Sequence, residues 1–557
     1  MPIINKTKRT ASIYNHGREV VKVYDHGKLA WQKSTSIPDY LCFTALESGT
    51  FTLTIPAAVT PTYLSYVEWS KDGRTWNHRD NSSEAVTIDV QVAQGEKVYW
   101  RGSGNRTTYG SYLENRSSRF SSTCRFDASG NLMSLLTDDF ANVTTWSHSY
   151  TFASLFNGCT TLISAKEMRL TLTTLPSTML IMTFNGASSM VSALTMDITD
   201  AGDNCFNSAF QGCSALTDVS GLKMTLGQLR TKVFYYTFRS CTGLVTPPPI
   251  SFTSFATSSS ENCLGMFYDC SSLESSFPLL PTTLVSKCYY AMFNNCRKLA
   301  SVKCLATDLS ATNCIYVWLA NTSSTGVFIQ AENVAYPRSS SGIPTGWVDI
   351  EKRTMPQGYK QVEYLSNPNY GYININRAFE ANAETLEVAF VKQATGVSMP
   401  FGSSIHNYRY GSVKVTEQAT ALAVNVGIDF ANQVNKIVSI ASVTADTPRT
   451  LRYEGNASGF EVYLDGVSKS TQTCAWDAVN SFASNMVFSA SANTSSTAYF
   501  HTKPIYYLKI WDGNGVLALD YVAAVRESDG VAGFYDMAAN TFHKSDNAND
   551  FTAGEEI

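Results

Sequence analysis

The chain has 557 residues, of which 16% are charged and 12% are aromatic, and its formal net charge is −4. At this length we expect several folded units rather than one compact domain. Lys and Arg form no basic cluster, which argues against a nucleic-acid partner, and no apolar run reaches the roughly 20 residues that span a bilayer, which argues against membrane insertion. The 29 Tyr residues and the abundance of Ser and Thr are typical of β-rich proteins, so we predict a mainly β, multidomain chain.

Residues 1–35 carry a short repeat of their own. IYNHGREVVK (Ile13–Lys22) is followed directly by VYDHGKLAWQ (Val23–Gln32), and each decamer predicts strand, turn and strand. Two such hairpins cannot bury a core alone, so we interpret them as a leader that docks on a partner, with a flexible leader as the alternative. His16 and His26 could bind metal together, but matching turn positions of a repeat explain them more simply. No apolar segment follows the first charges, so no secretory signal is predicted.

Residues 36–108 predict a small antiparallel β-sandwich. The runs FTLTIPAAV, YLSYVEWSKDG, AVTIDVQVAQG and KVYWRGSG alternate apolar and polar residues and are separated by turn residues. Trp69, Trp76 and Trp100 are expected in its core, with a sugar-binding platform as the alternative.

Residues 109–349 contain the repeat that organises the chain. A phrase with Phe, a small residue three positions on, and Leu or Met three further occurs six times, at intervals of 26 to 29 residues. Such a period predicts a solenoid in which equivalent residues stack in columns. We expect a short helical turn around each Phe, a strand in each link, and caps at Arg119–Leu136 and Phe328–Trp347. The repeat Phe residues are Phe156, Phe184, Phe210, Phe238, Phe267 and Phe293.

The small position of the repeat is occupied five times by one of the 13 cysteines. These five are Cys159, Cys213, Cys241, Cys270 and Cys296. No CxxC pair occurs, no His lies between Thr151 and Ile350, and the number of cysteines is odd. We therefore interpret them as columns of buried thiols rather than zinc ligands or disulfides, and we expect neither a metal nor a cofactor.

The phrases KCYYAMFNNCRKL and NCLGMFYDCSSL, with the linker LPTTL (Leu280–Leu284), resemble leucine-rich repeats of the BspA type. That family occurs in bacterial surface proteins and in viruses of gut bacteria. The resemblance covers roughly Phe120 to Trp347 and implies a leucine-rich repeat solenoid. The copy at Phe184 departs from the pattern, because Ala187 stands where other copies have Cys.

Residues 350–557 change in character. They open with MPQGYKQVEYLSNPNYGYININ and close with LKIWDGNGVLALDYVAAVRESDGVAGFYDMAANTFHKSDNANDFTAG. Hairpins are predicted at FEVYLDG (Phe460–Gly466) and IWDGNGV (Ile510–Val516). The two ends resemble a concanavalin-like, laminin-G-like jelly-roll module, which is common as the last domain of tail and fibre proteins in phages of gut bacteria. The resemblance implies a C-terminal β-sandwich.

Catalysis on such a sandwich would require two carboxylates facing each other across a cleft. The strings Glu-x-Asp-x-x-Glu and Glu-x-Asp-x-Glu do not occur, Glu384 and Glu387 are expected on opposite faces of a strand, and Asp465 is expected in a turn beyond Glu461. We therefore expect no enzymatic activity. In the segment Asp-Gly-Asn-Gly, a turn is a simpler interpretation than a calcium site built from Asp512, Asn514 and Asp520.

Binding is the function class that the composition favours. A solenoid offers a repeated face, a jelly roll offers loops at one end, and Tyr gives contact area at a low entropic cost. Candidate contact residues, each of which could instead pack in the core, are Tyr408 and Tyr410 in the last module and Tyr235, Tyr268 and Tyr289 on the solenoid.

The segments that flank the solenoid decide the functional prediction. A docking leader without a secretory signal, followed by two adhesive modules, favours a bacteriophage fibre protein that is made in the host cytoplasm and binds a host-surface glycan or protein. We expect a homotrimer, which would multiply weak contacts, and contacts with other virion proteins through the leader. Attachment to the tail or to the capsid stays open. The alternatives are a bacterial surface adhesin and, less favoured, a capsule depolymerase.

Overall fold

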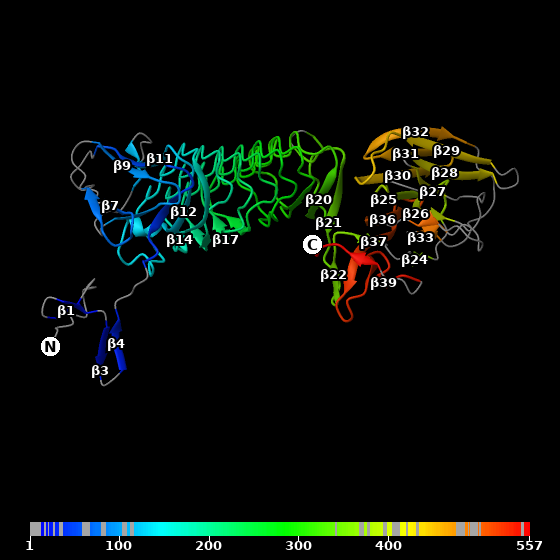
Figure 1. Cartoon of the computed structure of the whole chain (residues 1–557). Helices are drawn as coiled ribbons and strands as arrows, with labels where there is room; N and C mark the ends of the chain where they lie inside the picture. The colour runs from blue at the N-terminus through cyan, green and yellow to red at the C-terminus, as the bar shows by residue number, and fades with distance from the viewer. Residues whose placement is uncertain are drawn as a thin grey trace.

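The computed structural model shows an elongated, mainly β chain in which a solenoid lies between two β-sandwiches (Figure 1). The predicted mainly β, multidomain fold is confirmed, and no α-helix occurs among the described residues. None of the helical segments there has the length and apolar character of a membrane span. The structure describes residues 13–15, 18–20, 22–25, 28–32, 37–57, 67–79, 85–102, 109–111, 116–339, 342–366, 373–375, 379–393, 398–403, 413–418, 421–429, 434–474, 485–487, 489–490, 499–500, 503–546 and 551–557.

The leader forms the two predicted hairpins. Strand β1 (Ile13–Asn15) pairs antiparallel with β2 (Arg18–Val20), and β3 (Lys22–Asp25) pairs antiparallel with β4 (Lys28–Gln32). Each hairpin is a separate two-stranded sheet, so within the described residues the leader adds no strand to the rest of the fold. The turn residues, including both histidines, lie outside the described residues.

The N-terminal sandwich consists of two sheets that enclose an aromatic core. One sheet has the order β13-β12-β5-β10-β7-β8 and the other has the order β11-β6-β9. In β9 every second residue is buried, as one face of a sandwich requires. Trp100 is fully buried, whereas Trp69 and Trp76 are only partly buried. The strands are β5 (Leu41–Ala45), β6 (Gly49–Ile55), β7 (Val67–Ser70), β8 (Asn77–Arg79), β9 (Val86–Val92), β10 (Lys97–Gly102), β11 (Arg119–Ser122) and β12 (Phe126–Asn131), followed by a 3-10 helix (Leu132–Leu135).

The sandwich continues into the solenoid without a break in the core. Strand β12 pairs antiparallel with β5 of the sandwich and parallel with β13, the first strand of the solenoid. One hydrophobic cluster extends from Leu41 to Trp347. The segment Arg119–Leu136, which we expected to be a cap, therefore seals the first coil by sharing its strands with the sandwich.

The solenoid is a stack of coils joined by short parallel strands (Figure 1). Parallel pairs join β14 to β16, β15 to β17, β17 to β18, β19 to β20 and β20 to β21. The segment expected as the second cap begins within β20 and ends where β21 begins, so parallel stacking continues to the end of the solenoid. The strands are β13 (Leu162–Arg169), β14 (Thr174–Leu175), β15 (Met196–Ile198), β16 (Asp200–Ala201), β17 (Leu222–Leu229), β18 (Ile250–Phe255), β19 (Ser301–Cys304), β20 (Gly326–Ala331) and β21 (Trp347–Lys352).

The repeat Phe residues form a continuous ladder of stacked rings. All six are buried, and the centroids of successive rings lie 5.2 to 5.7 Å apart with interplanar angles of 1 to 8°. The rings stack in parallel because each coil places the same residue at the same point. Their burial removes a large apolar area from water in every coil.

The stretch around each Phe is a series of turns, so the predicted short helical turn is wrong. In one coil Lys232, Tyr236 and Ser240, which are four residues apart, have φ values of 55, 52 and 61°. A left-handed conformation at every fourth position cannot continue a helix and costs roughly 1 kcal/mol for each non-glycine residue. The cost is offset because alternate N–H groups donate to the next coil, as Phe238 donates to the carbonyl of Met266.

The repeat cysteines hold the coils together as hydrogen-bond donors. Four of the thiols donate to the carbonyl oxygen of the Phe in the preceding coil at 3.0 to 3.1 Å, namely Cys213 to Phe184, Cys241 to Phe210, Cys270 to Phe238 and Cys296 to Phe267. All 13 cysteines are free thiols, and all except Cys474 are buried. Burial raises the pKa of Cys205 to about 12 and that of Cys241 well above its usual range. The thiols are therefore protonated at neutral pH.

Within the described residues the C-terminal sandwich has one sheet of 11 strands, one of 6 and a two-stranded sheet of β34 and β35, and it has its own core. The predicted hairpins are confirmed, since β31 pairs with β32 and β36 pairs with β37. Its strands are β22 (Tyr359–Gln361), β23 (Leu365–Ser366), β24 (Ile373–Asn374), β25 (Thr385–Val391), β26 (Ser398–Ser403), β27 (Val413–Gln418), β28 (Ala421–Asp429), β29 (Val434–Ala441), β30 (Pro448–Asn456), β31 (Gly459–Leu464), β32 (Val467–Thr473), β33 (Asn485–Val487), β34 (Ser489–Ala490), β35 (Tyr499–Phe500), β36 (Ile505–Trp511), β37 (Leu517–Arg526), β38 (Ala532–Asp536), β39 (Thr541–His543) and β40 (Thr552–Ala553).

Truncating one ring of the ladder should destabilise the whole solenoid. Phe238 is fully buried and stacks between Phe210 at 5.3 Å and Phe267 at 5.5 Å. We expect Phe238→Ala to lower the free energy of unfolding by about 3–5 kcal/mol, measured by denaturant titration. The matched control is Val245→Ala, a side chain 41% exposed in the same coil, for which a change within about 0.5 kcal/mol is expected. An equal effect of the two substitutions would contradict the ladder.

The buried thiols should resist alkylation in the native protein. Because the thiolate is the reactive form, both burial and a raised pKa slow the reaction. We expect iodoacetamide at neutral pH to label Cys474 first and the repeat cysteines only after denaturation, as read by mass spectrometry of peptides. Rapid native labelling of Cys241 or Cys270 would show that the coils open.

Candidate binding sites on the solenoid and at its C-terminal junction

Five tyrosines lie on four successive coils of the solenoid, and we call them the tyrosine strip. They are Tyr235, Tyr236, Tyr268, Tyr290 and Tyr316, and all are at least partly exposed. The register between coils is fixed by backbone hydrogen bonds from Tyr236 to Leu264, from Gly265 to Tyr290 and from Ala291 to Tyr316. This register places three of the five tyrosines, Tyr235, Tyr290 and Tyr316, at the same position of their coils.

The rings of the strip contact one another and two cations. The centroids of Tyr235 and Tyr236 are 4.5 Å apart, and those of Tyr290 and Tyr316 are 5.3 Å apart. The guanidinium of Arg239 lies 4.9 Å from the ring centroid of Tyr236 and 5.2 Å from that of Tyr268. The Nζ atom of Lys232 lies 5.4 Å from the ring centroid of Tyr235. Arg239 therefore bridges two coils, which orders the rings before any ligand binds.

One glycine makes room for the strip. The ring of Tyr236 lies against Gly265 of the next coil, where an added Cβ would come within 2.2 Å of a ring carbon. Gly265 also has φ +56°, which favours glycine. Partial burial raises the pKa of the Tyr236 hydroxyl, so it stays a neutral donor at physiological pH.

The structure separates the tyrosines that the sequence singled out. Tyr235 and Tyr268 belong to the strip. Tyr289 is fully buried and stacks on Trp318 at 6.1 Å, so it packs in the core and cannot contact a ligand. The other two candidates, Tyr408 and Tyr410, lie outside the described residues.

Sequence reasoning missed the rest of the strip. Tyr290 stands three residues before Phe293, as Tyr235 does before Phe238, and this shared offset was a usable signal. Tyr236 and Arg239 have no such offset partner, because they occupy their positions in one coil only.

A second candidate site lies where the solenoid meets the C-terminal sandwich. Apolar residues of β20 and β21 pack against β25 and β36, and the last residue of the chain packs beside them. Figure 1 accordingly shows the C-terminus next to this junction. The cluster consists of Val327, Ile329, Val348, Ile350, Ala389, Val391, Tyr506 and Ile557.

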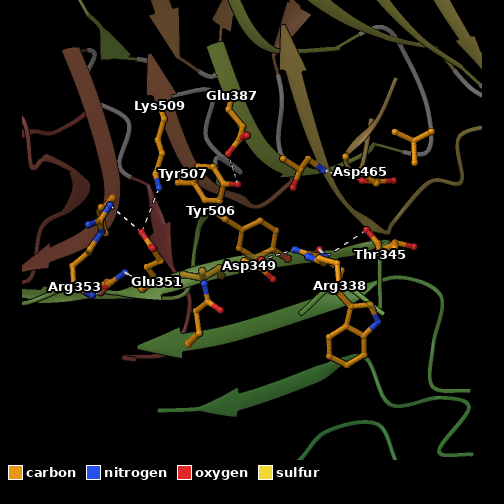
Figure 2. A pocket seen from close by; sticks show the side chains of 18 residues that line it. Arg338, Thr345, Asp349, Glu351, Arg353, Glu387, Asp465, Tyr506, Tyr507 and Lys509 are labelled. Carbon is orange, nitrogen blue, oxygen red and sulfur yellow. Dashed lines mark hydrogen bonds and ion pairs between the residues drawn. The ribbon is translucent and has the colours of Figure 1, made fainter. Parts of the chain in front are cut away.

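An ion-pair cluster around Arg353 adds to this contact. The guanidinium lies 2.8 Å from Glu332, 3.1 Å from Glu351 and 2.9 Å from Asp520 of β37. Lys509 of β36 lies 3.4 Å from the same Glu351 (Figure 2). Asp520 is 2% exposed, and burial raises its pKa although the charge of Arg353 opposes that rise. The cluster thus ties the solenoid to the sandwich through charges that are poorly hydrated.

Beside these contacts a cleft of about 440 Å³ opens between the two modules (Figure 2). On the solenoid side Arg338 donates to the carbonyl of Trp347 at 2.7 Å and pairs with Oδ2 of Asp349 at 2.5 Å. Oδ1 of Asp349 is buried and has no hydrogen-bond partner among the described residues. Burial raises the pKa of Asp349, while Arg338 lowers it.

The sandwich side of the cleft is lined by Tyr507, Lys509, Glu387 and Asp465 (Figure 2). Tyr507 donates its hydroxyl proton to Glu387 at 3.0 Å, and Lys509 lies 5.3 Å from the Tyr507 ring centroid. Asp465 accepts from Arg449 at 2.7 Å. Burial and the negative charge of Glu387 raise the pKa of Tyr507 well above its usual range, so its hydroxyl stays protonated.

The carboxylates that were weighed for catalysis or calcium have other partners. Glu387 lines the cleft, whereas Glu384 is buried and accepts from the N–H of Glu380 at 2.7 Å. Asp512 accepts from the N–H groups of Asn514 and Val516, so the Asp-Gly-Asn-Gly segment forms a turn. Within the part of the chain that the structure describes, no three His, Cys, Asp or Glu residues are placed to hold a metal ion.

No protein-family model and no curated protein matches the chain. Solved structures with some similarity include domains LG4-5 of the mouse laminin alpha1 chain, at 12% identity and a TM-score of 0.21, covering 29% of this chain and 43% of that one. A pentraxin from Limulus polyphemus shares 9% identity at a TM-score of 0.22, covering 35% of this chain and 91% of that one. The enzymatically active domain of tailspike protein 2 from bacteriophage CBA120 shares 10% at 0.22, covering 58% and 55%.

The chain therefore spans only about half of the laminin and tailspike chains that it matches. TM-scores this low do not define a shared fold, so the description of the modules rests on the chain's own strands and cores.

Removing the central cation of the junction should weaken it in a pH-dependent way. In Arg353→Met the buried Asp520 loses its counter-charge, and we expect a loss of about 3–5 kcal/mol in unfolding free energy at neutral pH. A folded-state pKa above the unfolded value means that the folded protein binds a proton more tightly. The deficit should therefore shrink as the pH falls from about 8 to about 5, measured by thermal unfolding at several pH values.

The double variant Arg353→Met/Asp520→Asn is the control for this interpretation. It removes both charges, so it should recover part of the stability and lose the extra pH dependence. A deficit of the single variant that is constant with pH would contradict the assigned role of Asp520.

Proposed function

We propose that this chain is an adhesive fibre protein of a bacteriophage virion and that the tyrosine strip binds a linear polysaccharide of the host surface. The strip is the observation that carries the proposal. Sugar rings present C–H faces that pack on aromatic rings and hydroxyl edges that accept and donate hydrogen bonds. An extended row of tyrosines offers both kinds of contact, and Tyr loses little entropy on binding.

The spacing of the strip suits a polymer better than a single sugar. Tyr290 and Tyr316 stand on adjacent coils with centroids 5.3 Å apart, comparable with the length of one sugar ring along a chain. Arg239, between Tyr236 and Tyr268, can donate to hydroxyl or carboxylate oxygens of a bound glycan. Each contact would be weak, and the row would add them together along the solenoid.

The virion assignment is supported by the order of the modules. A leader of two separate hairpins precedes the sandwich and solenoid, as a docking segment would, and the repeat resembles the BspA type found in viruses of gut bacteria. We propose that the leader contacts other virion proteins and that three copies assemble, so that several strips engage one surface. Binding rather than cleavage is the proposed activity, and no cofactor is required for it.

A bacterial surface adhesin with the same repeats would use the same strip. Mass spectrometry and immunogold imaging of purified virions separate the two candidates: a fibre protein is found on the particle, whereas an adhesin is found only on the bacterium. Incubating the protein with capsule and following the glycan length tests the depolymerase alternative, for which no shortening is expected.

Removing the exposed rings should abolish adhesion without unfolding the protein. We expect the triple variant Tyr268→Ala/Tyr290→Ala/Tyr316→Ala to bind capsulated gut bacteria and their isolated polysaccharides at least about tenfold more weakly, because each ring contributes a contact of hot-spot size. Pull-down and biolayer measurements with the full chain give the affinities.

The control for the strip is Tyr463→Ala, a partly exposed strand tyrosine in the C-terminal sandwich. Its affinity should equal that of the unaltered chain. The proposal fails if the triple variant adheres as strongly as the control, or if the unaltered chain binds none of the glycans of a host that its virion infects.

A further inference from the structure

We propose that the cleft between the solenoid and the C-terminal sandwich binds one amino-sugar unit through its ammonium group. None of the five tyrosines of the strip lines this cleft, which lies at the C-terminal end of the solenoid, beside β20 and β21 (Figure 1). The inference rests on the proposed function for one point only, which is that the natural ligand comes from a surface glycan.

Two buried acceptors in the cleft lack partners. Gln330 of β20 is 7% exposed, and its Oε1 has no hydrogen-bond partner among the described residues. Oδ1 of Asp349 on β21 is in the same state, and both side chains line the cleft. A buried polar atom without a partner costs free energy, so each exception requires an explanation. A ligand that donates hydrogen bonds to both would supply it.

The charges of the cleft favour a cationic donor. Seven charged side chains line it, with a formal sum of −1, namely Arg338, Arg353, Lys509, Asp349, Glu351, Glu387 and Asp465. The three cations already contact carboxylates at 2.5 to 3.4 Å. Of these seven, only Asp349 has one oxygen paired and the other buried without a hydrogen-bond partner among the described residues. An ammonium group supplies the strong, charge-assisted bond that this oxygen lacks.

The size and the walls of the cleft favour a small ring rather than a chain. A volume of about 440 Å³ lies in the lower half of the range of small-molecule sites. Among the aromatic residues of its lining, Tyr507 is partly exposed and offers apolar surface to the C–H face of a sugar, whereas Trp347 and Tyr506 are buried. The hydroxyl groups of the same sugar could donate to Gln330. A simple amine would leave that atom unpaired, and a neutral hexose would leave Asp349 without a cation.

Titration of the full-length protein with monosaccharides tests the site. We expect glucosamine or galactosamine to bind, and glucose and N-acetylglucosamine to bind at least about tenfold more weakly because neither carries an ammonium group. Calorimetry gives the Kd, and saturation-transfer NMR shows which sugar protons touch the protein. Asp349→Asn should weaken glucosamine binding at least about tenfold, and Gln330→Met should weaken it while keeping every charge.

Asp197→Asn, which changes an exposed carboxylate on β15 of the solenoid, is the matched control and should bind glucosamine normally. If Asp349→Asn fails to fold, Gln330→Met still decides the question. The inference is overturned if no amino sugar binds, if glucose or butylamine binds equally well, or if neither cleft variant changes the Kd.

The two proposals can fail separately. The triple tyrosine variant should bind glucosamine like the unaltered chain, because the strip does not line the cleft. Loss of adhesion to bacteria with glucosamine binding intact concerns the strip alone. Intact adhesion without glucosamine binding overturns the cleft assignment alone.

Discussion

The register between successive coils is the constraint on which the rest of the structure depends. Each coil donates alternate N–H groups to the next, and the same register stacks the Phe rings at 5.2 to 5.7 Å and aims the Cys thiols at the carbonyl groups of those Phe residues. Polar and apolar terms therefore favour one arrangement. Because each coil contacts only its neighbours, the apolar residues of the first and last coils must be shielded from water by other parts of the chain. The N-terminal sandwich covers one end by sharing β12, and the C-terminal sandwich covers the other by packing on β20 and β21.

The same register determines the outer surface. A repeat that stacks its inward residues must also align its outward ones, so a tyrosine that recurs at one offset becomes a row on the protein. Two neighbouring residues show this separation of inner and outer surface. Tyr289 faces the core and stacks on Trp318, whereas Tyr290 lies in the strip beside Tyr316. A row of this kind costs the fold little, since its members make few core contacts, and it is available for binding.

The sequence predicted those features that depend on periodicity. The six Phe positions, the solenoid and the hairpins could be predicted because each depends on the spacing of residues along the sequence. The turns around each Phe could not be predicted from the sequence. The left-handed conformation at residues such as Lys232 and Tyr236 is imposed by backbone hydrogen bonds to the next coil and not by local preference. The cleft could not be found either. Arg338 and Asp349 at the end of the solenoid and Glu387 in the sandwich form no motif, and only the docking of the two modules brings Glu387 to the other two.

The cleft also helps to explain why the solenoid and the C-terminal sandwich contact each other through charged residues. A purely apolar contact like that of Val348 and Ile350 would hold the sandwich in place without burying ions, which are costly to remove from water. Arg353 offsets part of that cost by pairing with Asp520, Glu332 and Glu351. Buried oxygens without a hydrogen-bond partner among the described residues remain on Asp520 and, beside the cleft, on Asp349 and Gln330. The oxygens of Asp349 and Gln330 differ from that of Asp520 in one respect, which is that their side chains line the cleft. Folding already fixes the orientation of these two side chains. A ligand would therefore bind them without the entropic cost of ordering them.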